Sequence, residues 1–134
     1  MIELTNSVAQ VVQPGQSVAF DTVVLHTGCG ECYRRNTPSI KLRANGIYEV
    51  AFSGNITGAT AGTPIQLSIA LGGIALPETV MVSTPATANA FSNVATSTFV
   101  QNTCGDYDRV TVVNSGTDPV TISANMNFSV RRLS

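Results

Sequence analysis

One histidine and three cysteines carry the chemistry that this chain could perform. His26, Cys29 and Cys32 stand at H-x2-C-x2-C spacing in one loop-like segment, and Cys104 lies far away at the start of another turn. One imidazole and three thiolates form a donor set that tetrahedral zinc accepts. The arginine pair that begins at Arg34 would lower the pKa of nearby thiols and favour thiolates. The four residues therefore predict a structural zinc site.

Two other states of the cysteines remain open. Cys104 could form a disulfide with Cys29 or Cys32, which would leave one thiol over from the odd count. Alternatively, all three thiols are reduced and share no role, because short C-x2-C spacings often mislead. A catalytic Cys–His pair has less support, since no Asn or Asp is placed to orient His26.

No other cluster predicts an active site. His26 is the sole histidine, so no Ser-His-Asp set can form without it, and no pair of carboxylates is convincingly placed. Asp106 and Asp108 flank Tyr107, but Ca²⁺ needs six or more oxygen ligands and the loop does not supply them. We therefore expect a protein that is not an enzyme.

Length and composition predict one globular domain, residues 1–134. Hydrophobic residues make up 43% of the 134, enough to bury a core. Charged residues make up only 11% and the net charge is −1, so the basic stripe of a nucleic-acid-binding protein is missing. No apolar run approaches the roughly 20 residues of a membrane helix. The N-terminal residues do not resemble a signal peptide, so we expect synthesis in a cytoplasm.

Alternation of apolar and polar residues predicts an all-β chain. Residues 39–58 indicate two strands joined as a hairpin by the Asn45-Gly46 turn. Residues 65–71 alternate in the same way, and residues 120–130 have the cleanest alternation, typical of one long strand. With turn signals roughly every 8–12 residues and no helical stripe, the pattern favours an antiparallel sandwich or barrel.

The order of short motifs resembles a known superfamily. Gly46-Ile47-Tyr48 opens an alternating strand, Gly105-Asp106 leads into the strand that begins at Arg109, and Phe128-Ser129-Val130 ends the last strand. Over nearly the whole chain this is similar to the tumour necrosis factor (TNF) and complement globular-head superfamily. The bacterial and phage branch, which includes the C-terminal heads of exosporium collagen-like proteins, is the most similar. The resemblance implies a jelly roll of about ten strands and a compact homotrimer.

Four large apolar residues are candidates for the core or for the subunit interface: Tyr48, Phe52, Met126 and Phe128. A sandwich core absorbs only one face of each sheet, so sequence alone does not assign them. The chain has no collagen-like stalk, which favours a free-standing trimer. We therefore expect a homotrimeric phage virion component, such as a capsid decoration or head-fibre protein. The alternative is a ligand- or carbohydrate-binding head on a bacterial cell or spore surface.

Overall fold

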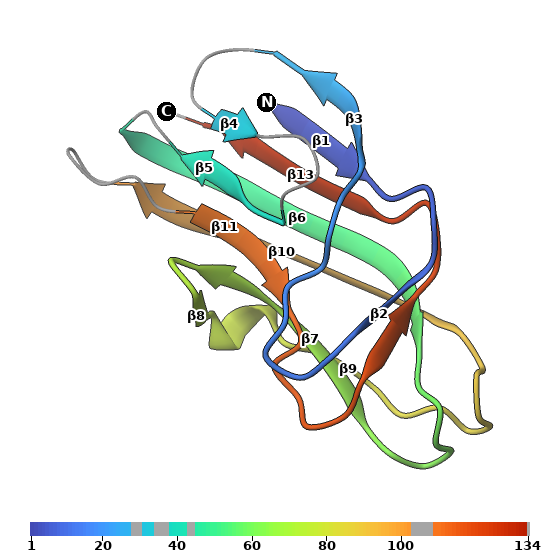
Figure 1. The fold of residues 1–134 in the computed structure, drawn as a ribbon. Helices are drawn as coiled ribbons and strands as arrows, with labels where there is room; N and C mark the ends of the chain where they lie inside the picture. Colours follow the sequence, from blue (N-terminus) through green and yellow to red (C-terminus); the bar gives the residue numbers. More distant parts are fainter. Residues whose placement is uncertain (28–30, 34–37, 43–44, 103–108, 134) are drawn as a thin grey trace.

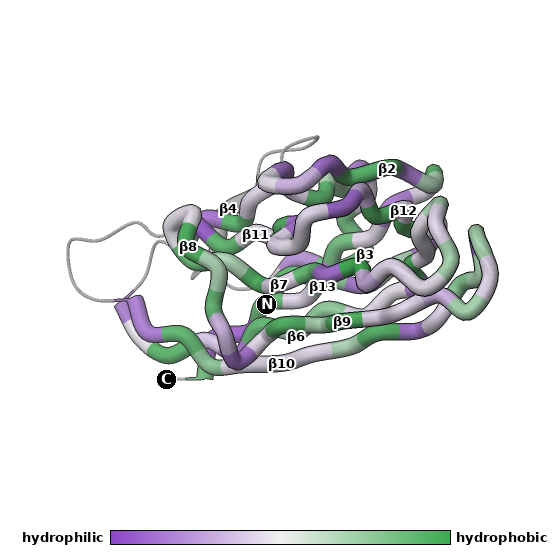
Figure 2. Tube along the Cα trace, turned by 90° about the horizontal axis from the view of Figure 1, so that it is seen from below, coloured by the Kyte–Doolittle hydropathy of each residue, from purple (hydrophilic) through white to green (hydrophobic). Residues whose placement is uncertain are grey.

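The chain forms two antiparallel sheets packed face to face (Figures 1 and 2). The computed structural model describes residues 1–27, 31–33, 38–42, 45–102 and 109–133, without the side chains of 31–33. Within this part there are thirteen strands and one short 3-10 helix. The expected antiparallel jelly-roll sandwich is confirmed, with more strands than expected because several are divided.

Sheet A has seven strands and is centred on β6, its longest strand. β10 pairs with one edge of β6, while β13 and β12 pair with the other edge at successive positions. The sheet continues from β13 to β1 and β3, and from β12 to β2. Its strands are β1 (Ile2–Thr5), β2 (Gln10–Val12), β3 (Thr22–His26), β6 (Gly46–Thr57), β10 (Ser92–Asn102), β12 (Val120–Ile122) and β13 (Asn127–Arg132).

Sheet B covers the inner face of sheet A and has six strands. Its strands are β4 (Glu31–Tyr33), β5 (Ile40–Leu42), β7 (Ile65–Leu71), β8 (Ile74–Ala75), β9 (Met81–Ser83) and β11 (Arg109–Val113). The 3-10 helix η1 (Pro77–Thr79) separates β8 from β9, because proline cannot donate to a sheet ladder. In the described part of the chain, no helix is long and apolar enough to cross a membrane.

The core lies between the two sheets and collects alternate residues of each strand. On β6 the side chains of Tyr48, Val50, Phe52 and Ile56 are buried, while those of Glu49 and its alternate neighbours face outward. The connection between β2 and β3 adds Val18 and Phe20 to the same core. Burial of this alternating face accounts for the period-two pattern seen in the sequence.

The prediction of a hairpin over residues 39–58 is wrong. β5 pairs with β4 and β11 in sheet B, whereas β6 pairs with β10, β12 and β13 in sheet A. The chain therefore crosses from one sheet to the other near Asn45-Gly46 instead of folding back beside itself. Gly46 has a φ of 150°, which a residue without a side chain adopts at little cost.

The prediction of one long strand over residues 120–130 is also wrong. It is divided into β12 and β13, which both pair with β6. Asn125 lies between them in the left-handed region, at φ 68°, and its N–H donates to the carbonyl oxygen of Asn6 at 2.7 Å. Asparagine adopts this conformation more readily than most residues do. The backbone can therefore turn at Asn125 and divide the strand, although the apolar and polar residues go on alternating in the sequence.

Candidate subunit interface

The predicted metal site lies mainly outside the described residues. His26 ends β3 and is exposed, and the backbone of Cys32 lies in β4 opposite Lys41. Cys29, Cys104 and the side chain of Cys32 are not described. Elsewhere in the described part of the chain, no three His, Cys, Asp or Glu side chains are grouped to hold a metal ion. The zinc site therefore stays a prediction.

The four apolar candidates lie inside the sandwich. Tyr48, Phe52, Met126 and Phe128 are each no more than 2% exposed, and Phe52 and Phe128 contact one another edge-on. Because these side chains are covered within one chain, a contact between subunits needs other residues.

The outward side of β6, β10 and β13, called here the outer face of sheet A, has a band of small side chains. The pairing register sets Ser97 and Ser129 on either side of Ala51, and Ala95 beside Ser53. Ala51, Ser53, Ala95, Ser97 and Asn127 line a shallow hollow on this face. A hollow floored by alanine and serine leaves room for a large side chain from another molecule.

A large exposed side chain lies next to this hollow on the same face. Phe99 follows Ser97 by two residues on β10, about 7 Å along the strand, and is 63% exposed. It lies opposite Glu49, which forms an ion pair with Arg131 at 3.1 Å on its other side. The outer face of sheet A thus has an aromatic projection and a hollow side by side.

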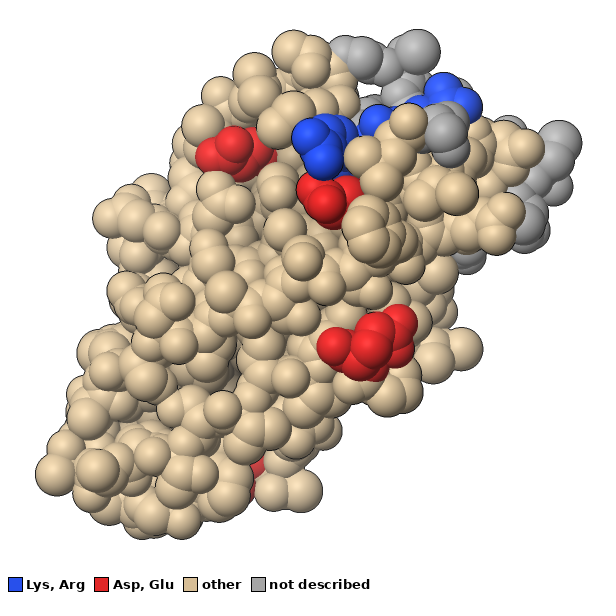
Figure 3. Space-filling view, turned by 180° about the vertical axis from the view of Figure 1, so that it is seen from behind, with Lys and Arg blue, Asp and Glu red and all other residues tan. Residues whose placement is uncertain are grey.

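Charges on this side of the molecule are sparse. Seen from behind, the surface is largely uncharged (Figure 3). A basic group adjoins an acidic group near one end, further basic groups lie at that same end, and other acidic groups are set apart. Exposed ion pairs such as Glu49–Arg131 contribute only about 0–1 kcal/mol, because solvent screens them. A low charge density limits the desolvation cost of covering such a face.

Sequence reasoning missed Phe99, although a signal for it was present. Phe99 and Val100 are adjacent apolar residues in one strand, so their side chains point to opposite faces of the sheet. Val100 is buried and Phe99 is exposed. Two large apolar neighbours in a strand thus indicate that one of them lies outside the core.

Comparison with known proteins identifies the fold. No family model matches the chain, and no curated protein matches its sequence. The globular domain of zebrafish complement 1qA superposes with a TM-score of 0.74 at 11% identity, covering 99% of this chain and 96% of that one. Eiger TNF from S. frugiperda gives 0.72 at 11% identity, covering 99% and 91%. PRD1 vertex protein P5 gives 0.60 at 16% identity, covering 99% and 96%. The chain therefore has the TNF-like jelly-roll fold.

Proposed function

We propose that residues 1–134 form one domain that assembles into a non-enzymatic homotrimer and serves as a structural component of a phage virion. Within the virion, the protein would serve as a capsid decoration or head-fibre protein. Synthesis would take place in the bacterial host cytoplasm, followed by incorporation into the particle. The main observation in support of the trimer is that exposed Phe99 lies next to the small-residue hollow on the outer face of sheet A.

This adjacency suits a ring of identical subunits in which the outer face of sheet A lines the ring axis. There each subunit meets both of its neighbours, so Phe99 can contact one neighbour while the hollow receives Phe99 of the other. Phe99 of one copy would enter the hollow beside Ala51 and Ser97 of the next copy. Full burial of a phenylalanine side chain is worth about 1.5–3 kcal/mol, and a trimer repeats that gain at each of its interfaces.

The virion role has separate support. One solved protein with this fold is named as a phage vertex protein, PRD1 P5. A surface with few charges suits a protein packed densely in an assembly, and only 11% of residues are charged. The sole histidine, His26, belongs to the cysteine-containing segment, so a catalytic base of the commonest kind is not otherwise supplied.

The alternative function is a ligand- or carbohydrate-binding head on a bacterial cell or spore surface. The fold shared with the complement 1qA globular domain is compatible with it. A pocket lined by Thr60, Thr63, Asp118 and Thr121 is the specific observation in its favour.

Two measurements test the proposal. Light scattering on the purified protein should give three times the 14.0 kDa subunit mass, and a monomer would contradict the assembly. Mass spectrometry of purified particles from the host culture should detect the chain at a fixed ratio to the capsid protein. Detection only in cell-surface or spore fractions would instead favour the alternative.

A further inference from the structure

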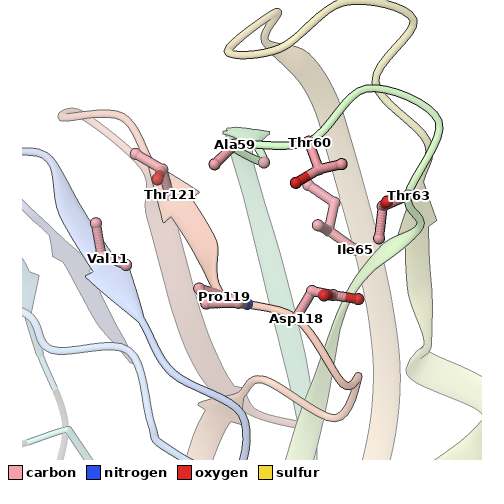
Figure 4. Close-up of a pocket in the computed structure, with 9 residues that line it drawn as sticks. Val11, Ala59, Thr60, Thr63, Ile65, Asp118, Pro119 and Thr121 are labelled. Carbon is pink, nitrogen blue, oxygen red and sulfur yellow. The ribbon is translucent and has the colours of Figure 1, made fainter.

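A small pocket opens beside the residues that follow the end of β6, and Figure 4 shows the side chains that line it. Residues 58–63 after β6 form one side, and residues 118–121 at the start of β12 form the other. Its volume is about 180 Å³. Pockets for drug-sized ligands have roughly 300–1,000 Å³, so this one suits a single small ring. We call it the Asp118 pocket.

The polar groups of the pocket are one carboxylate and three hydroxyls. Oδ2 of Asp118 accepts a hydrogen bond from the Thr117 hydroxyl at 3.2 Å, and in the described part of the chain Oδ1 has no partner. Thr60, Thr63 and Thr121 line the same opening (Figure 4). A carboxylate accepts hydrogen bonds, while a hydroxyl both donates and accepts. Together they match a ligand that carries several neighbouring hydroxyl groups.

Apolar side chains make up the rest of the lining. Val11 is 57% exposed beside the opening, and Pro119 and Ile65 lie across from it. Sugar rings present C–H groups between their hydroxyls, and these gain from apolar contact. A bare cation would gain nothing from this apolar contact. One carboxylate also supplies far fewer oxygen ligands than the six to eight that Ca²⁺ takes.

Hydrogen bonds hold both sides of the pocket in place without a ligand. Asn114 is 1% exposed, and its Nδ2 donates to the carbonyl oxygens of Val12 at 2.9 Å and Asp118 at 2.8 Å. Its Oδ1 accepts from the N–H of Gly116 at 3.0 Å, which fixes the turn before Asp118. On the opposite side, the N–H of Gly62 donates to the carbonyl oxygen of Pro85 at 2.8 Å. Such preorganisation lowers the entropy lost on binding.

We propose that the Asp118 pocket binds one neutral sugar unit of a glycan, with the Asp118 carboxylate accepting hydrogen bonds from adjacent sugar hydroxyls. One chain supplies every lining residue, so the site does not depend on the trimer or on the virion role proposed above. It adds a recognition function to a protein otherwise proposed as structural.

Titration of ¹⁵N-labelled protein with glucose, galactose, mannose and N-acetylglucosamine tests this site. At least one of these sugars should produce saturable shifts confined to amides of residues 58–63 and 117–121. The variant Asp118→Asn should weaken that binding roughly tenfold, since it loses a charge-assisted hydrogen bond. Glu78→Gln, which alters an exposed carboxylate on η1, should bind like the wild type.

Several outcomes would overturn the proposal. These are no saturable shift with any of the four sugars, equal affinity in Asp118→Asn, or saturable shifts with CaCl₂ in place of sugar. Thr60→Val is a second variant whose exposed position tolerates substitution. Its affinity should also fall, by severalfold, while its spectrum outside the pocket stays that of the wild type.

Discussion

Phe20 stacks on Phe128 inside the sandwich, with ring centroids 5.1 Å apart and ring planes inclined by 18°. Phe128 lies on β13, while Phe20 comes from the connection between β2 and β3. Phe128 also meets Phe52 edge-on at 6.5 Å. This aromatic contact thus packs the connecting segment against sheet A, in addition to the hydrogen bond from the Val18 N–H to the carbonyl oxygen of Val112 in sheet B.

Phe20→Ala and Phe128→Ala should each lower the free energy of unfolding by about 3–5 kcal/mol, because each leaves a cavity in a buried site. The double variant should reveal a coupling of about 0.5–1.5 kcal/mol between the two rings. Urea unfolding at one fixed protein concentration measures both quantities. Phe91→Ala, at an exposed position, should change stability by less than about 0.5 kcal/mol. A similarly small effect for Phe20→Ala would mean that the connection does not belong to the core.

Phe99→Asp should convert the proposed trimer to a monomer, because a carboxylate buried in the hollow would lack a partner. Light scattering gives the mass directly, and circular dichroism should show an unchanged fold since Phe99 is exposed in the single chain. Ile74→Asp is the matched control: it is 73% exposed on β8 of sheet B and should leave the trimer intact. A trimer of Phe99→Asp would place the interface on another face.

Stability should fall in acid partly through Asp21. The pKa of its carboxyl is lowered, first by the hydrogen bond from the Ser7 hydroxyl at 2.5 Å and then by that from Thr22 at 2.9 Å. A lowered native pKa means that this stabilisation is present above the unfolded value of 3.8 and is lost as the pH falls through the native value. The melting temperatures of wild type and Asp21→Asn should therefore differ at neutral pH and converge below about pH 4. A gap that widens in acid would contradict this sign.

Purified without chelator, the protein should contain about one zinc per chain, held by His26, Cys29, Cys32 and Cys104. Metal analysis gives the content, and Cys104→Ser should lower it. A chelator should lower the melting temperature of the wild type, because a structural metal stabilises the fold that binds it. Zinc-free protein in which all three thiols react freely would contradict the zinc site and indicate cysteines with no shared role. A mass lower by two hydrogen atoms in the absence of reductant would instead indicate a disulfide.

Local patterns predicted the strands but not always their partners. Alternation identified β6 because this strand buries one face in the core. It also identified β7, although Ser68 and Ala70 are buried there as well as Leu67 and Ile69. The Asn45-Gly46 step predicted a hairpin, yet β5 and β6 belong to different sheets. A turn dipeptide bends the chain without selecting the sheet that it joins. Pairing of Ile40 with Val110, far along the chain, makes that selection.

The candidate sites were harder to predict for the same reason. Phe99 could be found from its apolar neighbour Val100, since a strand buries only one of two adjacent side chains. The Asp118 pocket leaves no such local trace. It exists only because residues 58–63 and 118–121 meet at one end of the fold, which depends on the pairing of β12 with β6.

The position of β13 has a consequence for the order in which the sheet can form. β13 lies between β1 and β6, with Val130 opposite both Ile2 and Val50, so the most C-terminal of the described strands completes the middle of sheet A. Until then β1 can pair only with β3, and one edge of β6 stays open along most of its length. Sandwiches dominated by such distant pairings fold in milliseconds to seconds. Sheet A therefore closes only when β13 has paired with both β1 and β6, and assembly between subunits through this sheet must wait for that step.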